Sequence, residues 1–137
     1  MNNEIDYGRS IGAIVGGFFV MTALGLLTGM LAFKLFLPTV SAGETLTPTA
    51  TYLIVRMALN FLTAFVGGYV AAAISGAARL AHALILAGII MVISMIGLAL
   101  AARLNPGAPS PGWYEYSSGL LVPAGVVIGG WYRSRKN

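Results

Sequence analysis

Apolar residues dominate four long stretches of the chain that contain no charged side chain, at 10–33, 57–78, 80–102 and 116–132. A helix rises about 1.5 Å per residue, so roughly 20 residues cross a hydrocarbon layer of about 30 Å. Each stretch is apolar all round a helix rather than on one face, which is typical of helices embedded in lipid. The pattern predicts an all-α integral membrane four-helix bundle with antiparallel up-down topology.

Turn-forming residues separate these stretches and indicate the helix ends. Residues 38–50 are rich in Thr, Ser, Gly and Pro, 105–112 hold three prolines, and Gly76 centres a turn so short that the flanking helices should be antiparallel neighbours. Thr47-Pro48 and Ser110-Pro111 each resemble an N-cap followed by proline at the first helical position. We expect one domain, 1–137, with helices at roughly 9–37, 48–75, 78–104 and 111–133.

A secretory signal peptide is the alternative interpretation of the first stretch, because Val40-Ser41-Ala42 resembles a small-residue cleavage site. The apolar stretch is longer than the roughly 7–15 residues of a signal sequence. Lys34 also lies between that stretch and the site. We therefore expect a retained first span.

Composition agrees with a lipid environment. Charged residues make up 9% of the chain and hydrophobic residues 58%, whereas a soluble domain has roughly 25% charged residues. The net charge is +4, but the cations are scattered singly along apolar sequence, which argues against nucleic acid as a partner. There is no cysteine, which excludes disulfides, thiol nucleophiles and cysteine-based zinc sites. The expected surroundings are the lipid bilayer.

The distribution of Lys and Arg predicts the orientation of the chain. Cytoplasmic segments of membrane proteins carry an excess of these residues. We expect a multi-pass protein of the cell inner membrane with both termini cytoplasmic. The expected inner cations are Arg9, Arg79, Arg133, Arg135 and Lys136, and the outer ones are Lys34, Arg56 and Arg103.

Small residues recur at a spacing of four, which places them on one helix face where another backbone can approach closely. The candidate packing residues are Gly8, Gly12, Gly16, Gly25 and Gly29 on the first helix, Gly68 on the second, and Gly125 and Gly129 on the fourth. Gly-Gly-aromatic triplets at 16–18, 67–69 and 129–131 predict tight packing in the cytoplasmic half and a looser, more polar outer half. The motif fits packing within the chain and also a dimerising face.

A polar stripe on the second helix is the main candidate site. Arg56, Asn60 and Thr63 share one helix face, and such a stripe should face protein or water rather than lipid. Lys34 and Glu115 should lie at a similar outer depth, and we predict that Glu115 pairs with Arg56 or Lys34. The stripe is either an outward-facing pocket for a small solute, or snorkelling cations with a buried Asn joining two helices.

Other chemistry is sparse. His82, the one histidine, could be an axial ligand to a pigment or haem, or simply a polar side chain at a helix start. Pro123 predicts a kink in the fourth helix. The spans hold no carboxylate pair, no nucleophile with a base and no phosphate-binding loop. We expect no enzyme activity, no metal site and no cofactor.

Several short motifs occur in a recognisable order: GGYVAA at 67–72, HAL at 82–84 after a short basic turn, PGWY at 111–114, then Pro123 and Gly129-Gly130. From Arg56 onward the chain resembles a loose group of uncharacterised small bacterial four-transmembrane-helix proteins. The resemblance implies a bacterial inner-membrane location and no particular activity.

Three functions are compatible with these observations. The first is a non-catalytic accessory or structural subunit of a larger membrane complex, packed against other membrane subunits or itself. The second is a small homo-oligomeric channel or transporter, with Arg56, Asn60 and Thr63 along the path of a small solute. The third, a membrane enzyme, lacks the residues for catalysis.

Overall fold

The computed structural model describes residues 7–36, 48–76, 78–104 and 111–136, and these residues form four helices and no strand. The helices are α1 (Tyr7–Phe36), α2 (Ala50–Ser75), α3 (Arg79–Leu104) and α4 (Gly112–Ser134). Every end lies within two residues of the predicted position, and the all-α prediction is confirmed for this part of the chain. Three helices, α1, α2 and α3, are long and apolar enough to cross a membrane.

The starts of α2 and α4 differ in detail from the predicted caps. Thr49 is the N-cap of α2, and its hydroxyl accepts a hydrogen bond of 3.3 Å from the backbone N–H of Tyr52. Pro48 therefore precedes the cap instead of following it. Pro111 itself occupies the N-cap position of α4, without a side-chain capping bond. The predicted cap residues Thr47 and Ser110 lie outside the described residues.

A glycine and two arginines shape the end of α2. Gly76 has φ of 76°, a left-handed conformation that L side chains rarely adopt, so the predicted turn at this glycine is confirmed. Arg9 Nε donates to the Ile74 carbonyl at 2.8 Å, and Arg79 Nε donates to the Gly76 carbonyl at 3.0 Å. Cations stabilise the carbonyl end of a helix, because its last acceptors have no partner within the helix.

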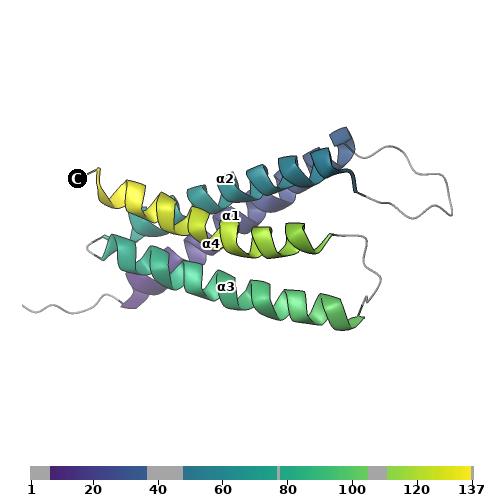
Figure 1. The fold of residues 1–137 in the computed structure, drawn as a ribbon. Coiled ribbons are helices and arrows are strands. Elements are labelled where there is room, and N and C mark those ends of the chain that lie inside the picture. Colours follow the sequence, from purple (N-terminus) through teal and green to yellow (C-terminus); the bar gives the residue numbers. More distant parts are fainter. Residues whose placement is uncertain (1–6, 37–47, 77, 105–110, 137) are drawn as a thin grey trace, which may run out of the picture.

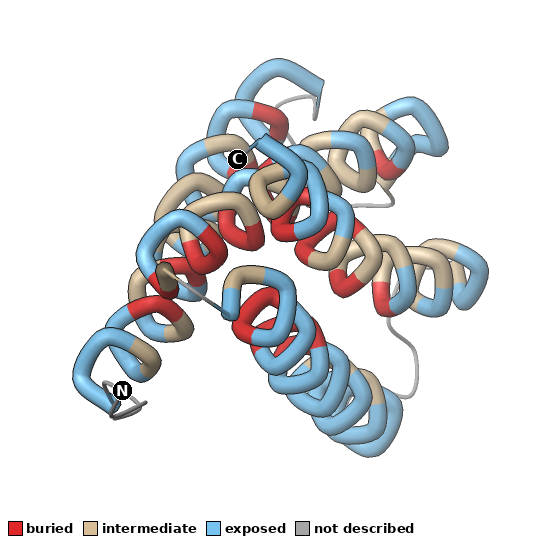
Figure 2. The backbone as a smooth tube through the Cα atoms, turned by 90° about the vertical axis from the view of Figure 1, so that its left-hand side faces the viewer, coloured by how far each residue is buried: buried red, intermediate tan, exposed pale blue. Residues whose placement is uncertain are grey.

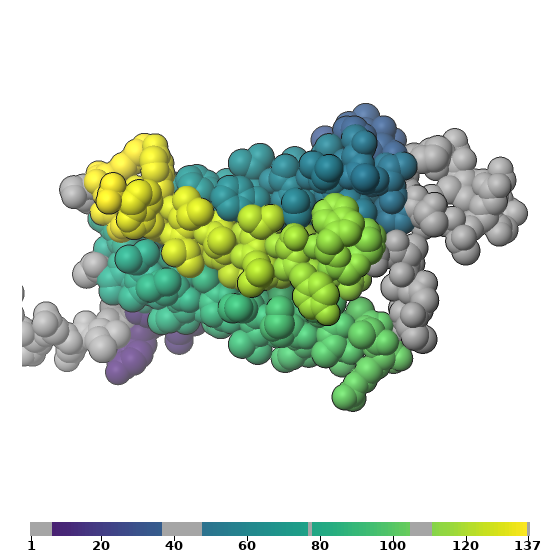
Figure 3. Space-filling view, in the orientation of Figure 1, coloured from purple at the N-terminus to yellow at the C-terminus, as the bar shows by residue number. Residues whose placement is uncertain are grey.

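The helices run alternately in opposite directions: α1 and α3 run toward one end of the molecule, and α2 and α4 run back (Figure 1). The space-filling view shows α4 lying between α2 and α3 on one face (Figure 3). α2 contacts all three other helices, whereas α1 and α4 do not meet within the described residues. The sequence predicts that α2 and α3 are antiparallel neighbours, and the two helices are in contact, but α2 packs chiefly against α4 and α1.

Small side chains form most of the buried core. The buried apolar cluster consists of Ala64, Ala71, Leu86, Ala87, Ile90 and Val126. Buried segments lie on the faces where helices meet, and exposed segments face outward (Figure 2). Large apolar side chains point outward too: Phe19 is 70% exposed and Leu120 60%. An outer surface of this kind suits lipid better than water.

Candidate functional site

Glycines bring neighbouring helices into backbone contact at three places near one end of the molecule. A Cβ atom on Gly17 would stand 2.7 Å from the Gly67 carbonyl oxygen, between α1 and α2. Gly68 lies directly against the backbone of Val126, between α2 and α4. Gly129, on α4, lies as closely against the backbone of Phe65 on α2. We call this region the packed end, and the close packing predicted from the Gly-Gly-aromatic triplets is confirmed there.

The same triplets supply close contacts that the four-residue spacing did not single out. Besides Gly17 and Gly67, these include Gly130, which lies against the Ala83 side chain and joins α4 to α3. Gly125 was predicted and also packs tightly, because a Cβ there would stand 2.9 Å from the Phe61 carbonyl oxygen. The doubled glycines were the signal, because two adjacent glycines lie on two different faces of the same helix.

Within the chain, most of the glycines predicted to pack along α1 receive no neighbouring helix, and their use as a dimerising face stays a prediction. A Cβ on Gly12 or Gly25 would have nothing within 4 Å, and Gly8 and Gly12 are exposed. Gly16 meets only the end of the Ile74 side chain, at 2.9 Å. The face of α1 that turns inward instead carries Ala13 and Gly17, which are buried, and it lies about 100° around the helix from the face of Gly12 and Gly16.

Cations at the packed end are held by aromatic rings as well as by carbonyls. The Arg133 guanidinium lies 5.8 Å from the centre of the Tyr69 ring, which joins α4 to α2. Arg135 lies 4.0 Å from the centre of the Trp131 ring, and Lys136 Nζ lies 4.7 Å from that of Tyr132. Cation–π contacts of this kind are worth about 0.5–1 kcal/mol at exposed sites.

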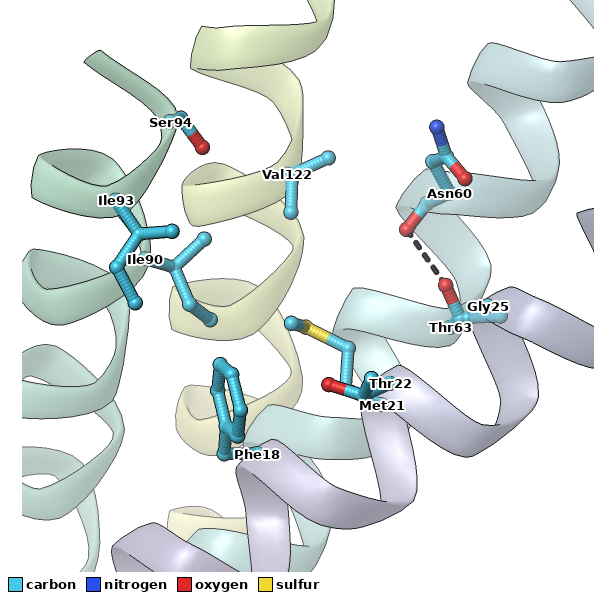
Figure 4. Close-up of a pocket in the computed structure, with 10 residues that line it drawn as sticks. All are labelled: Phe18, Met21, Thr22, Gly25, Asn60, Thr63, Ile90, Ile93, Ser94 and Val122. Carbon is cyan, nitrogen blue, oxygen red and sulfur yellow. Dashed lines mark hydrogen bonds between the residues drawn. The ribbon is translucent and has the colours of Figure 1, made fainter. Parts of the chain in front are cut away.

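An open cavity of about 280 Å³ lies between the helices, and residues of all four helices line it. We call it the central cavity. Figure 4 shows Ile93 and Ser94 of α3 on one side and Asn60 and Thr63 of α2 on the other. The Thr63 hydroxyl donates to the Asn60 backbone carbonyl at 3.0 Å. Asn60 itself is half-buried and lines the same cavity. The walls of this cavity combine apolar side chains with a few polar groups.

The polar stripe of α2 faces protein, as predicted. Thr63 is buried, and Arg56 and Asn60 are half-buried. Asn60 and Thr63 line the central cavity, but Arg56 does not. The Arg56 guanidinium instead lies across Gly29 of α1 and lines a separate cleft with Lys34 and Tyr52. The residues of the stripe therefore line two separate cavities and do not follow one another along a single solute path.

The predicted pairing of Glu115 is wrong. Within the described residues no salt bridge joins Glu115 to Arg56 or Lys34, and these residues line different cavities. Glu115 lies between α3 and α4, beside Ser118, whose buried hydroxyl has no hydrogen-bond partner. Helix order explains the difference, since α4 packs away from α1 and carries Glu115 out of reach of the α1–α2 cleft.

Sequence reasoning missed several residues at these two sites. Thr22 and Ser94 also line the central cavity, and Tyr52 lines the Arg56 cleft. Thr22 and Ser94 are isolated hydroxyl residues within apolar stretches. That isolation was the one available signal, but it does not say which way a side chain faces.

His82 is buried near the start of α3. Its Nδ1 lies 2.8 Å from the Ala78 carbonyl oxygen, and because a carbonyl oxygen only accepts, Nδ1 is the donating nitrogen. The bond closes the first turn of α3, and axial ligation by this histidine stays a prediction. Across the part of the chain that the structure describes, no three His, Cys, Asp or Glu residues gather where a metal ion could bind.

Comparison with known proteins finds no matching family model, no matching curated protein and no matching solved structure. The resemblance to small bacterial four-helix proteins therefore stays a prediction.

Proposed function

We propose that the chain is a four-span protein of a bacterial inner membrane, with up-down topology and both termini in the cytoplasm. Support comes from three helices that meet the length and composition of a span, and from α4, whose 23 residues extend about 35 Å beside them. Charge supports the orientation, because Lys and Arg favour the cytoplasmic side. The packed end carries Arg9, Arg79, Arg133, Arg135 and Lys136, and the opposite end carries Lys34, Arg56 and Arg103.

Reporter fusions test this topology. A phosphatase that is active only in the periplasm should be inactive when fused after residue 137 and active when inserted within 38–47. A fluorescent protein that matures only in the cytoplasm should give the reverse result. Periplasmic activity of the C-terminal fusion would overturn the orientation.

Within the membrane we propose a non-catalytic role as an accessory or structural subunit of a larger complex. The observation that carries this proposal is the uncovered small-residue face of α1. Gly8 and Gly12 lie four residues apart and are exposed, and a Cβ on Gly12 meets nothing within 4 Å. At Gly17, Gly68 and Gly129, by contrast, the backbone of a neighbouring helix lies against the glycine. A partner helix could approach α1 here as closely as α2 approaches it at Gly17.

Co-purification in mild detergent tests the subunit role. The tagged chain should bring down other membrane subunits in fixed ratio. Gly12→Ile should lower that yield severalfold without lowering thermal stability, because the face is open. Gly88→Ile is the matched control, since it adds the same bulk at an exposed glycine of α3 where a Cβ would also meet nothing within 4 Å. Purification as a monomer, or equal yields from both variants, would contradict the proposal.

A small channel or transporter is the second candidate, and the central cavity is the observation that favours it. The cavity is large enough for a small solute and presents Asn60, Thr63, Thr22 and Ser94. Gly25→Leu should plug the cavity, because nothing lies within 4 Å of a Cβ there, and Gly88→Leu is an equally open control outside it. Purification as a lone symmetric oligomer, with solute flux in liposomes that only Gly25→Leu abolishes, would favour this function over the first.

A further inference from the structure

A cleft between the last turns of α1 and the first turns of α2 gathers two cations. It has a volume of about 310 Å³ and is lined by Arg56, Lys34 and Tyr52 together with apolar side chains of α1. Within the described residues, no acidic side chain lines this cleft. Among the described residues, two positive charges therefore share one cleft without a nearby negative charge.

The position of Arg56 depends on a glycine. Gly29 is buried, and a Cβ added to it would collide with the Arg56 guanidinium. The absence of a side chain at Gly29 thus lets the guanidinium lie against α1 at this position. Within the described residues, neither Arg56 nor Lys34 has a hydrogen bond or an ion pair. A half-buried guanidinium with five N–H donors needs an acceptor to offset its desolvation.

Apolar side chains lead from these cations toward the middle of the molecule. Phe33, Met30 and Leu26 follow one another along one face of α1, at spacings of three and four residues, and all line the cleft. Each is at least half exposed: Phe33 50%, Met30 64% and Leu26 65%. The cleft therefore presents positive charge at the helix ends and a continuous apolar wall below them.

We propose that this cleft binds the phosphate group of an anionic phospholipid, with one acyl chain lying along the apolar wall of α1. The Arg56 guanidinium matches two phosphate oxygens at once, Lys34 adds a second positive charge, and the Tyr52 hydroxyl can donate at the interface. A free phosphate ion would use the cations but not the apolar wall, so the lipid is the occupant that fits both. The proposal rests on the chain spanning a membrane, and not on its partners.

Native mass spectrometry of the purified chain tests this site. The protein in detergent is titrated with phosphatidylglycerol, with phosphatidylethanolamine of the same acyl chains, and with inorganic phosphate. We expect phosphatidylglycerol to be retained about fivefold more strongly than phosphatidylethanolamine for each cation that contributes. Inorganic phosphate should give no retained adduct.

Three variants test whether the preference for phosphatidylglycerol over phosphatidylethanolamine arises at the cleft. Arg56→Gln and Lys34→Gln should each reduce it about fivefold. Gly29→Ala keeps the net charge but displaces the guanidinium, so it should reduce the preference as well. Arg103→Gln removes an exposed cation at the same end of the molecule and is the matched control, which should leave the preference unchanged.

Two results would overturn the proposal. Equal losses in Arg56→Gln and Arg103→Gln would show that net charge alone governs retention. Inorganic phosphate bound as tightly as the lipid would show a soluble-anion site. Lys34→Gln decides the matter if Arg56→Gln fails to fold, because Lys34 is exposed and its loss disturbs no packing. Topology fusions and co-purification do not depend on these results.

Discussion

The two ends of the bundle use the same residue types in opposite ways. At the packed end, glycines of α1, α2 and α4 lie against backbone atoms of a neighbouring helix, and Arg9, Arg79 and Arg133 contact carbonyls or rings. At the other end, which we call the open end, helices separate around cavities, and Arg56 and Lys34 have no partner among the described residues. Gly29 receives a cation there rather than a helix.

This contrast indicates where stability and binding each reside. Lipid tails are as apolar as leucine, so close packing rather than water exclusion must hold helices together in a membrane. The packed end supplies that contact, and the open end holds cavities and cations that have no partner among the described residues. A mutation should therefore affect stability at the packed end and ligand binding at the open end.

The largest expected effect is a difference in the free energy of unfolding between alanine substitutions at two glycines in different surroundings. Gly68→Ala would place a Cβ against the Val126 backbone, which cannot move aside as a flexible side chain can. We expect a loss of about 3 kcal/mol in the free energy of unfolding, the upper part of the range for overpacked cores. Gly12→Ala, where nothing lies within 4 Å, should change it by less than about 1 kcal/mol. Titration with SDS in mixed micelles measures both, and equal losses would contradict the contrast.

The sequence predicted the helices well because apolar length and turn residues are local signals. It also predicted which end is packed, since the Gly-Gly-aromatic triplets at 16–18, 67–69 and 129–131 all occur there. It did not predict which glycine of the first triplet meets the α2 backbone, because Gly16 and Gly17 lie on different faces of α1 and only Gly17 turns inward. Whether that end faces the cytoplasm stays a prediction.

The candidate site was predicted only in part, for a related reason. The spacing of Arg56, Asn60 and Thr63 correctly indicated a face turned toward protein. The division of that face between two cavities depends on how α1 and α4 cross α2. The close contact of Arg56 with Gly29 likewise depends on how two different helices pack. Periodicity within one helix contains no information on such crossings.

A smaller effect on the free energy of unfolding is expected when a cation is removed at the packed end rather than at the open end. Arg9 Nε donates to the Ile74 carbonyl at the end of α2, so Arg9→Gln should lower the free energy of unfolding by about 1 kcal/mol, as expected for a cation at a helix C-terminus. Arg103→Gln is the control at the open end, where the side chain is exposed, and should change stability by less than about 0.5 kcal/mol. The same SDS titration serves both variants. A larger loss from Arg103→Gln would place a structural cation at the open end.

The smallest expected effect concerns Glu115, whose charge has no cationic partner among the described residues. Glu115→Gln keeps the size of the side chain, so stability in detergent should change by less than about 0.5 kcal/mol. A double-mutant cycle with Arg56→Gln isolates any direct interaction between the two charges. Because they line separate cavities, their coupling energy should be zero within error. A coupling of about 1 kcal/mol or more would mean that the open end closes into an ion pair, and Arg56 would then not be free to hold a lipid phosphate.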